Sequence, residues 1–354
     1  MQPQASPPLA PVEALRRIAF LLERALEPSY RVRAFRRAAA AIEGFDEAEL
    51  RRLAAGPGLR ALAGVGAVTE RVVREALDGE VPVYLRRLEA TEGRPVAEGA
   101  AALRAALQGD CHLHSDWSDG GAPIEEMAAA ARDLGHQWAA LTDHSPRLTV
   151  ARGLSPARLR AQLDEVARLN ERFAAAAAAG AAAPFRLLSG IEVDILEDGS
   201  LDQEEDLLGR LDVVVASVHS GLRTPRAEMT RRMVAAVGNP HTDVLGHCTG
   251  RIVVGRGRPE SQFDPEAVFA ACAAHGVAVE VNSRPERRDP PKRLLRLAVE
   301  AGCLVAVDTD AHAPGQLDWQ LGGCERAFAC GVGADRVVNA RGAEELLAWT
   351  GRRR

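Results

Sequence analysis

The chain has 354 residues, of which 47% are hydrophobic and 26% are charged, and its net charge is −5. This composition is typical of a globular protein with a sizeable core, and it excludes both a disordered chain and a uniformly basic nucleic-acid coat. No run of about 18 apolar residues occurs, so the sequence predicts no membrane-spanning helix and no membrane partner.

The first part of the chain has helical patterns only. Residues 1–11 are rich in proline, and we expect them to form a disordered tail. Residues 12–92 are expected to form a small all-α domain, with a tight Gly64-Val65-Gly66 turn ahead of its last well-defined helix. The helices are predicted at 12–26, 32–42, 47–55 and 67–77, with a short segment at 59–62 ahead of the turn. Residues 93–108 are expected to be a linker that ends in a short helix.

From residue 109 to residue 348, short β-rich runs alternate with helical stretches. Such alternation is typical of a parallel α/β barrel with helices on its outside. The strands are predicted at 110–114, 138–142, 185–194, 211–219, 243–248, 277–282 and 304–309. The fold class is therefore α/β, a seven-stranded barrel related to the TIM barrel, preceded by the helical domain.

Six of the nine histidines and three carboxylates lie where the predicted strands end. These nine residues are His112, His114, Asp119, His144, Glu192, His219, His247, Asp310 and His312. In an α/β barrel the C-terminal ends of the strands meet on one face, so nine potential ligands would point into one cup. Imidazole together with carboxylate suits zinc, manganese or iron.

Spacing within the motifs supports a metal centre. His112 and His114 are two residues apart on one strand, so both side chains point to the same face of the sheet. Nine ligands exceed the needs of one ion, and we therefore predict two or three divalent ions. Clustered ions are the usual apparatus for cleaving phosphate esters, because they activate water and stabilise the attacking and leaving oxygens.

Six motifs resemble, in order, those of the PHP (polymerase and histidinol phosphatase) family: CHLHSDWSDG, LTDHS, GIEVDI, ASVHS, GHCTGR and DTDAH. LSGIEVDILEDGSLD and VEVNSRPERRD are similar to the C-terminal PHP domain of bacterial family-X DNA polymerases, over residues 109–348. SYRVRAFRRAAAAIEGF and LAGVGAVTERVVREAL resemble the helix-hairpin-helix module that opens those polymerases, over residues 12–92. Residues 93–108 have no room for a polymerase domain, so we expect no polymerase activity.

The resemblance implies a distorted (β/α)7 barrel with a trinuclear metal site. All nine residues match ligand positions of the family, and Glu192 is the expected bridge between two ions. Two further residues are catalytic candidates. Asp143 stands beside His144, with a surface role as its alternative. Arg251 follows the fifth predicted strand, and its guanidinium could bind a substrate phosphate. Three further arginines lie just after predicted strand ends and are candidates for the same role: Arg223, Arg256 and Arg287.

The helical module is a candidate DNA-binding domain. Gly64 and Gly66 would let backbone N–H groups approach a phosphate at the start of a helix, a contact that reads no base sequence. Arg33, Arg36 and Arg37 would add positive charge. The alternative is a protein-docking or structural cap. Residues 1–108 contain no lysine, which excludes a lyase that forms a Schiff base there.

Together these observations predict a metal-dependent phosphoric ester hydrolase that processes DNA 3′ ends in repair. The expected reactions are 3′–5′ exonuclease, 3′-phosphatase or abasic-site cleavage, and a repair polymerase is a further candidate partner. Six scattered cysteines without a CxxC pair, and no secretory signal pattern, favour the cytoplasm. Two alternatives remain: a small-molecule phosphomonoesterase of the histidinol-phosphatase type, and a non-catalytic DNA-binding repair scaffold.

Overall fold

The computed structural model of the chain describes residues 7–56, 58–90 and 96–353. The chain divides into two compact units, residues 1–95 and 96–354. Residues 1–6 of the predicted tail, and residues 93–95 of the predicted linker, lie outside the described residues. The first helix begins at Pro11, the last residue of the predicted tail.

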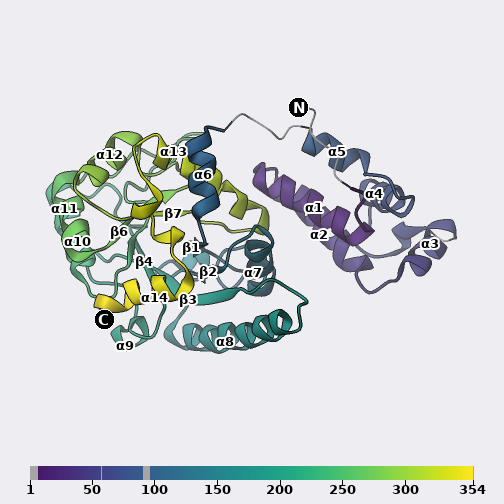
Figure 1. Ribbon diagram of the computed structural model, residues 1–354, viewed down its shortest axis with the longest axis horizontal. Helices are drawn as coiled ribbons and strands as arrows, with labels where there is room; N and C mark the ends of the chain where they lie inside the picture. Colours follow the sequence, from purple (N-terminus) through teal and green to yellow (C-terminus); the bar gives the residue numbers. More distant parts are fainter. Residues whose placement is uncertain (1–6, 57, 91–95, 354) are drawn as a thin grey trace. The chain divides into compact units, whose positions relative to one another are not determined.

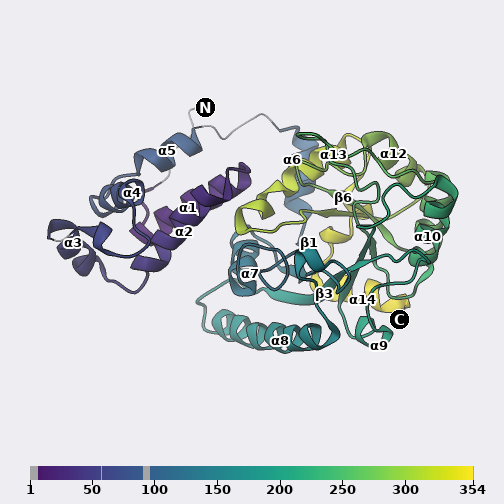
Figure 2. The ribbon, with the colours of Figure 1, turned by 180° about the vertical axis from the view of Figure 1, so that it is seen from behind.

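The described part of the first unit contains helices and no strand. Its elements are α1 (Pro11–Arg24), α2 (Ser29–Ile42), α3 (Glu47–Ala55), the 3-10 turn η1 (Leu59–Ala61), α4 (Ala67–Leu77) and α5 (Val83–Glu89). Helix α1 packs against α2, α4 and α5, and Figures 1 and 2 show α1 and α2 side by side. The core is apolar and includes Leu15, Ile18, Leu22, Phe35, Ile42, Val73 and Leu85.

Proline sets two helix starts that the sequence pattern placed less well. Helix α2 begins directly after Pro28, three residues before its predicted start, because the proline is the N-cap. Helix α5 begins after Pro82 and buries Leu85, and no separate helix was predicted there. Proline is tolerated at the first turn of a helix, where its missing N–H would have no intrahelical partner.

Seven parallel strands make up the sheet of the second unit within the described residues. They are β1 (Gly109–Leu113), β2 (Trp138–Leu141), β3 (Arg186–Asp194), β4 (Val213–Ser217), β5 (Val244–Leu245), β6 (Ala278–Asn282) and β7 (Val305–Asp308). Each strand pairs with its neighbour in sequence, from β1 to β7. All seven predicted strands are therefore confirmed, although β5 is much shorter than expected.

The sheet nearly closes on itself where β1 meets β7. The N–H of Asp310 donates to the carbonyl of His112 at 3.0 Å, and the N–H of His114 donates to the carbonyl of Ala311 at 2.8 Å. A parallel bridge joins Leu113 and Ala311. The predicted α/β barrel, preceded by a helical domain, is thus confirmed.

Helices cover the outside of the barrel (Figure 1). They are α6 (Glu98–Ala106), α7 (Ile124–Asp133), α8 (Pro156–Ala178), α9 (Glu205–Leu208), α10 (Arg226–Gly238), α11 (Pro265–His275), α12 (Lys292–Glu300), α13 (Gln320–Phe328) and α14 (Ala343–Thr350). Helix α6 packs on α13, so the second half of the predicted linker belongs to this unit. Ser155 and Asp264 cap α8 and α11 through their side chains. Within the described ranges, no helix combines the length and apolar character needed to cross a bilayer.

Candidate metal centre

Parallel strands deliver the predicted residues to one end of the barrel. His112 is in β1 and His114 follows it; Glu192 is in β3. The others come just after strands: His144 after β2, His219 after β4, His247 after β5, and Asp310 and His312 after β7. Asp119 lies in the loop between β1 and α7.

Glu192 lies at the centre of this cluster. Its Oε1 is 2.8 Å from Nε2 of His247 and 3.1 Å from Nε2 of His219. Its Oε2 is 2.9 Å from Nδ1 of His144 and 3.3 Å from Nε2 of His112, and His114 lies a little farther, at 3.6 Å. A single buried carboxylate thus faces five imidazoles.

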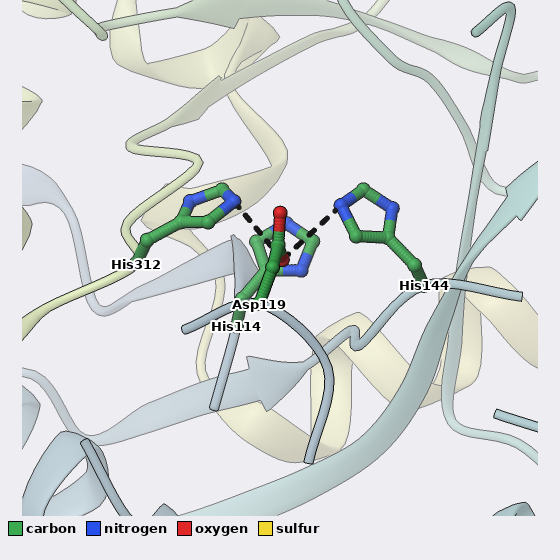
Figure 3. A group of neighbouring side chains, drawn as sticks. All are labelled: His114, Asp119, His144 and His312. Carbon is green, nitrogen blue, oxygen red and sulfur yellow. Dashed lines mark ion pairs between the residues drawn. The ribbon is translucent and has the colours of Figure 1, made fainter. Parts of the chain in front are cut away.

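A second carboxylate, that of Asp119, lies close to two histidines on the more exposed side of the nine residues. Figure 3 shows its Oδ1 between His144 and His312, with His114 behind. The carboxylate oxygen is 3.5 Å from Nε2 of His144 and 3.3 Å from Nε2 of His312. Asp119 is 38% exposed in its side chain, whereas His114 is fully buried, so the cluster opens on this side.

Three overlapping groups of side chains have donor atoms close enough to hold a metal ion. They are His112 with His114 and Asp310; His114 with Asp119, His144 and His312; and His144 with Glu192 and His219. Within each group the donor atoms lie within 4.8 Å of one another. His247 belongs to none of the three, but it contacts Glu192. All nine predicted residues are therefore brought together.

Unpaired buried atoms show that this donor set fits divalent cations. Ten side-chain nitrogen and oxygen atoms of six cluster residues are buried without a hydrogen-bond partner. They belong to His112, His114, His144, Glu192, His219 and His247. Burying so many polar atoms without partners is costly, and a bound cation would accept their lone pairs. The imidazole and carboxylate donors suit zinc, manganese or iron.

The charges in the cluster favour ionised carboxylates. Burial alone would raise the pKa of Glu192, but the surrounding histidines, His219 first, hold it well below its ordinary value. Burial likewise acts against Asp310, and Arg287 with His114 lowers its pKa well below the usual range. Both carboxylates are thus ionised at neutral pH and can act as anionic donors.

The histidines respond differently to their surroundings. Burial, with His312 and His144 nearby, lowers the pKa of His114 to about 3, so this imidazole is neutral. Burial also opposes protonation of His219, but Glu192 and Asp194 outweigh it and raise its pKa to about 9. Binding a cation would displace a proton from such a histidine, so metal binding is linked to pH.

Asp143 is buried, and both of its carboxylate oxygens accept hydrogen bonds. Its carboxylate accepts hydrogen bonds from Ser115, from the Ser118 hydroxyl at 2.5 Å and from the Gln162 amide at 2.6 Å. These bonds order the loop that carries Asp119. The predicted catalytic candidate is therefore buried and held by four donors, which is the arrangement of a residue that positions others.

The guanidinium of Arg251 is engaged with residues outside the set of nine. Its guanidinium donates to the carbonyl of Arg287 at 3.1 Å and to that of Arg288, and it pairs with Glu260 at 3.5 Å. Arg287, in contrast, places Nε 3.1 Å from Oδ2 of Asp310. Of the arginines considered from the sequence, Arg287 is the one that contacts the cluster, while Arg223 and Arg256 are exposed.

Two buried polar residues of β6 adjoin the nine residues and were not predicted from the sequence. Glu280 is fully buried, and its Oε1 lies 2.6 Å from Nδ1 of His112. Asn282 donates to Asp310 at 3.1 Å. The signal was present, because an acidic residue and an amide interrupt an apolar strand at alternating positions and so share one face.

The hairpin of the first unit has the backbone that its sequence predicts. Gly64 has φ +97°, and a Cβ there would lie 3.3 Å from the carbonyl oxygen of Arg37. Gly66 is the N-cap of α4 and has open space around it. Arg33 and Arg37 are exposed, whereas Arg36 is turned to the buried Glu23 at 2.6 Å. Two of the three predicted DNA-contacting arginines are thus presented to solvent.

Comparison with known proteins agrees with both halves of the structure. Residues 110–284 match the family model described as PHP domain, and residues 7–81 match the model described as helix-hairpin-helix domain. The DNA polymerase/3′-5′ exonuclease PolX of Bacillus subtilis (strain 168) is 37% identical over 243 residues, 69% of this chain. The chain spans only 41% of the length of that protein.

Phosphatases are similar as well. A probable phosphatase of Thermoanaerobacter sp. (strain X514) is 29% identical over 246 residues, covering 65% of this chain and 89% of that protein. The solved histidinol phosphate phosphatase of Lactococcus lactis subsp. lactis Il1403, complexed with zinc, L-histidinol and phosphate, gives a TM-score of 0.46 at 16% identity. That alignment covers 64% of this chain and 95% of the other. By its sequence, the chain contains a PHP domain, and a helix-hairpin-helix domain precedes it.

Proposed function

We propose that this protein processes the 3′ ends of DNA, as a 3′–5′ exonuclease, a 3′-phosphatase or an abasic-site nuclease, in DNA repair. The observation that carries the proposal is the union of two domains in one chain. A helix-hairpin-helix domain precedes a PHP domain that is similar to PolX, whose name includes 3′-5′ exonuclease. The match of 243 residues is far longer than the first unit, so it includes the PHP domain.

The nine clustered residues are the proposed ligands of two or three divalent ions of zinc, manganese or iron. When bound, such ions supply a nucleophile from water and neutralise charge that develops on the phosphate oxygens. Glu192, facing five imidazoles, is the proposed bridging ligand. Asp119 and His312 mark the open edge, where a phosphate ester would enter.

Arginine side chains near this edge would help to hold the substrate. Arg287 and Arg284 lie 3.1 and 3.8 Å from the carboxylate of Asp310, and each side chain is partly exposed. Their guanidinium groups place positive charge beside the cluster, where a planar fork suits a phosphate. This role replaces the one predicted for Arg251, whose guanidinium is engaged with backbone carbonyls.

The helix-hairpin-helix domain is the proposed DNA-holding part. The exposed Arg33 and Arg37 and the backbone N–H groups at the start of α4 suit phosphate contacts without base recognition. No segment between the two matched domains is long enough for a polymerase, so we propose no polymerase activity. Resynthesis after 3′ processing would then fall to a separate repair polymerase as a partner.

A gel assay tests the proposal. The protein, reconstituted with manganese, is incubated with a 5′-labelled primer–template. His219→Ala removes a side chain of the cluster, and His241→Ala is the matched control, since His241 precedes β5 at the opposite end of the strand. We expect shortened or 3′-dephosphorylated primers with the unaltered protein and with His241→Ala, and none with His219→Ala. Intact primers from a protein with bound metal would refute the proposal.

The second candidate is a small-molecule phosphomonoesterase of the histidinol-phosphatase type. The similarity to a probable phosphatase over 89% of its length favours it. The two candidates differ in salt dependence, because DNA binding releases counterions and weakens steeply as salt rises. A protein that hydrolyses histidinol phosphate rapidly, and whose affinity for DNA is negligible at low salt, would support this second function.

A further inference from the structure

Glu280 is a buried acidic residue in the middle of an apolar strand, and none of the roles above uses it. Strand β6 contributes Ala278, Val279, Glu280, Val281 and Asn282, all of them buried. An unpaired carboxylate in such a place would be expensive, so its partners indicate what it does.

The carboxylate of Glu280 contacts three groups: the His112 ring, the His247 backbone N–H and the Asn282 amide. Its Oε1 lies 2.6 Å from Nδ1 of His112. Its Oε2 accepts the backbone N–H of His247 at 2.5 Å and the amide of Asn282 at 3.2 Å. The same Asn282 amide donates to Asp310 at 3.1 Å. Both oxygens of Glu280 therefore act as acceptors.

This arrangement decides which nitrogen of His112 faces the cluster. Nε2 of His112 is 3.3 Å from Oε2 of Glu192 and is buried without a hydrogen-bond partner. A neutral imidazole carries one N–H, and Nδ1–H donated to Glu280 leaves the lone pair on Nε2. The outer partner of a metal-binding histidine typically fixes its tautomer and orientation in this way.

We infer that Glu280 is a positioning residue, which holds His112 with its Nε2 lone pair directed at a divalent ion. The inference rests on the ligand role proposed for His112. Glu280 does not touch the substrate; it acts through His112 and, by way of His247 and Asn282, on the alignment of two neighbouring strand ends. It extends the nine-residue set by one residue that the motif comparison did not single out.

Glu280→Gln tests the inference, because glutamine is nearly isosteric but offers only one acceptor oxygen. If the new amide NH2 group faces His247, it meets the backbone N–H of His247, and two donors oppose each other. If it faces His112, Nδ1 of His112 must become the acceptor, and the Nε2 that faces the nine residues then carries the proton and has no lone pair for a metal ion. Loss of such an outer partner typically weakens metal binding 10- to 100-fold. We expect that loss for at least one zinc ion per chain, measured by calorimetric titration of the metal-stripped, full-length protein.

Asp289→Asn is the matched control. Asp289 is equally buried, but its carboxylate accepts from Thr249 and from the backbone of Arg251 rather than from a cluster side chain. We expect zinc affinity close to that of the unaltered protein. Unchanged zinc binding in Glu280→Gln, or equal losses in both variants, would overturn the inference.

A second measurement needs no variant that must fold. In the zinc-loaded, unaltered protein labelled with ¹⁵N-histidine, we expect the ring of His112 to show a protonated Nδ1 and a zinc-bound Nε2. A zinc-bound Nδ1, or no zinc binding at all, would overturn the inference. Neither readout involves DNA, so failure of the proposed DNA substrate is distinguishable from failure of this inference.

Discussion

Asp143 accepts two hydrogen bonds from Ser115, one from its backbone N–H at 2.8 Å and one from its hydroxyl at 2.6 Å. Together with Ser118 and Gln162, these donors saturate the carboxylate. The residue that stands next to His144 in sequence therefore orders the neighbouring loop, from which Asp119 reaches the metal cluster. We therefore propose that Asp143 contributes to the geometry and stability of the site.

Replacing Asp143 should damage both the fold and the metal site. Asp143→Ala leaves several buried donors without an acceptor, and we expect the free energy of unfolding to fall by about 1–3 kcal/mol. Metal binding should weaken because the loop with Asp119 loses its anchor. Denaturant unfolding and metal titration measure the two effects. Asp133→Ala, at an exposed carboxylate, is the control; wild-type metal affinity in Asp143→Ala would contradict the positioning role.

Glu192→Gln should remove at least one bound ion per chain. The substitution deletes the negative charge that five imidazoles face and directs an N–H group at some of them. Metal content after reconstitution and dialysis, read by elemental analysis, gives the result. Glu197→Gln alters an exposed carboxylate just beyond the same strand and should keep the full metal content. Equal metal content in the two variants would show that Glu192 is not a ligand.

The two hairpin glycines should respond differently to alanine. Gly64 has φ +97°, and an added Cβ would press on the carbonyl of Arg37, so Gly64→Ala should cost about 1–3 kcal/mol of stability. Gly66 has ordinary extended backbone and open space, so Gly66→Ala should fold normally.

DNA binding separates the structural from the functional effect of these glycines. Gly64→Ala should lower the affinity for a DNA duplex in a fluorescence titration, because its strain disturbs the hairpin. Hydrolysis of a small chromogenic phosphodiester should stay at the wild-type rate in both variants. If that hydrolysis falls in step with DNA affinity, the proposed division of labour between the two domains is wrong.

Acid should destabilise the barrel partly through His136. Burial, with Arg104 beside it, lowers the pKa of His136 to about 4, against an ordinary value of about 6.5. The unfolded state therefore binds the proton more readily between these values. The stabilisation by neutral His136 is complete above about pH 6.5 and is lost as pH falls toward 4, a difference of about 3 kcal/mol.

Urea unfolding of the metal-free protein at several pH values checks this effect. We expect His136→Gln to show a shallower loss of stability than the unaltered protein between pH 6.5 and pH 4, whatever its stability at pH 7. The difference between the two curves cancels the other titrating groups, which both proteins share. Parallel curves would mean that His136 is protonated in the folded state as readily as in water.

Most of the nine candidate ligands could be predicted because they lie at the C-terminal ends of strands. Parallel strands bring their C-terminal ends together, so the positions of His144, His219 and Asp310 along the chain were enough to place them near one another. Glu280 was harder, because the sequence alone did not reveal that its carboxylate reaches the far ring nitrogen of His112. That contact joins strands 168 residues apart.

The arginines show where sequence proximity misleads. Arg251 follows His247 closely, yet its guanidinium is captured by carbonyls more than 30 residues away. Arg36 is drawn to Glu23 by the packing of α2 on α1. A long, flexible side chain chooses among all acceptors within reach, and that choice depends on tertiary neighbours that local spacing does not specify.

Because the barrel nearly closes between β1 and β7, the proposed metal ligands lie on both sides of that seam. Two of the proposed ligands, His112 and His114, come from the end of β1, and two, Asp310 and His312, follow β7. Ions bound to both pairs would therefore hold the first and last strands of the sheet together. Removing the metal should loosen this seam before it loosens β3 and β4, whose pairing is continuous over five residue pairs. Amide hydrogen exchange would then speed up first along β1 and β7. Metal loss would therefore begin to open the barrel between its first and last strands.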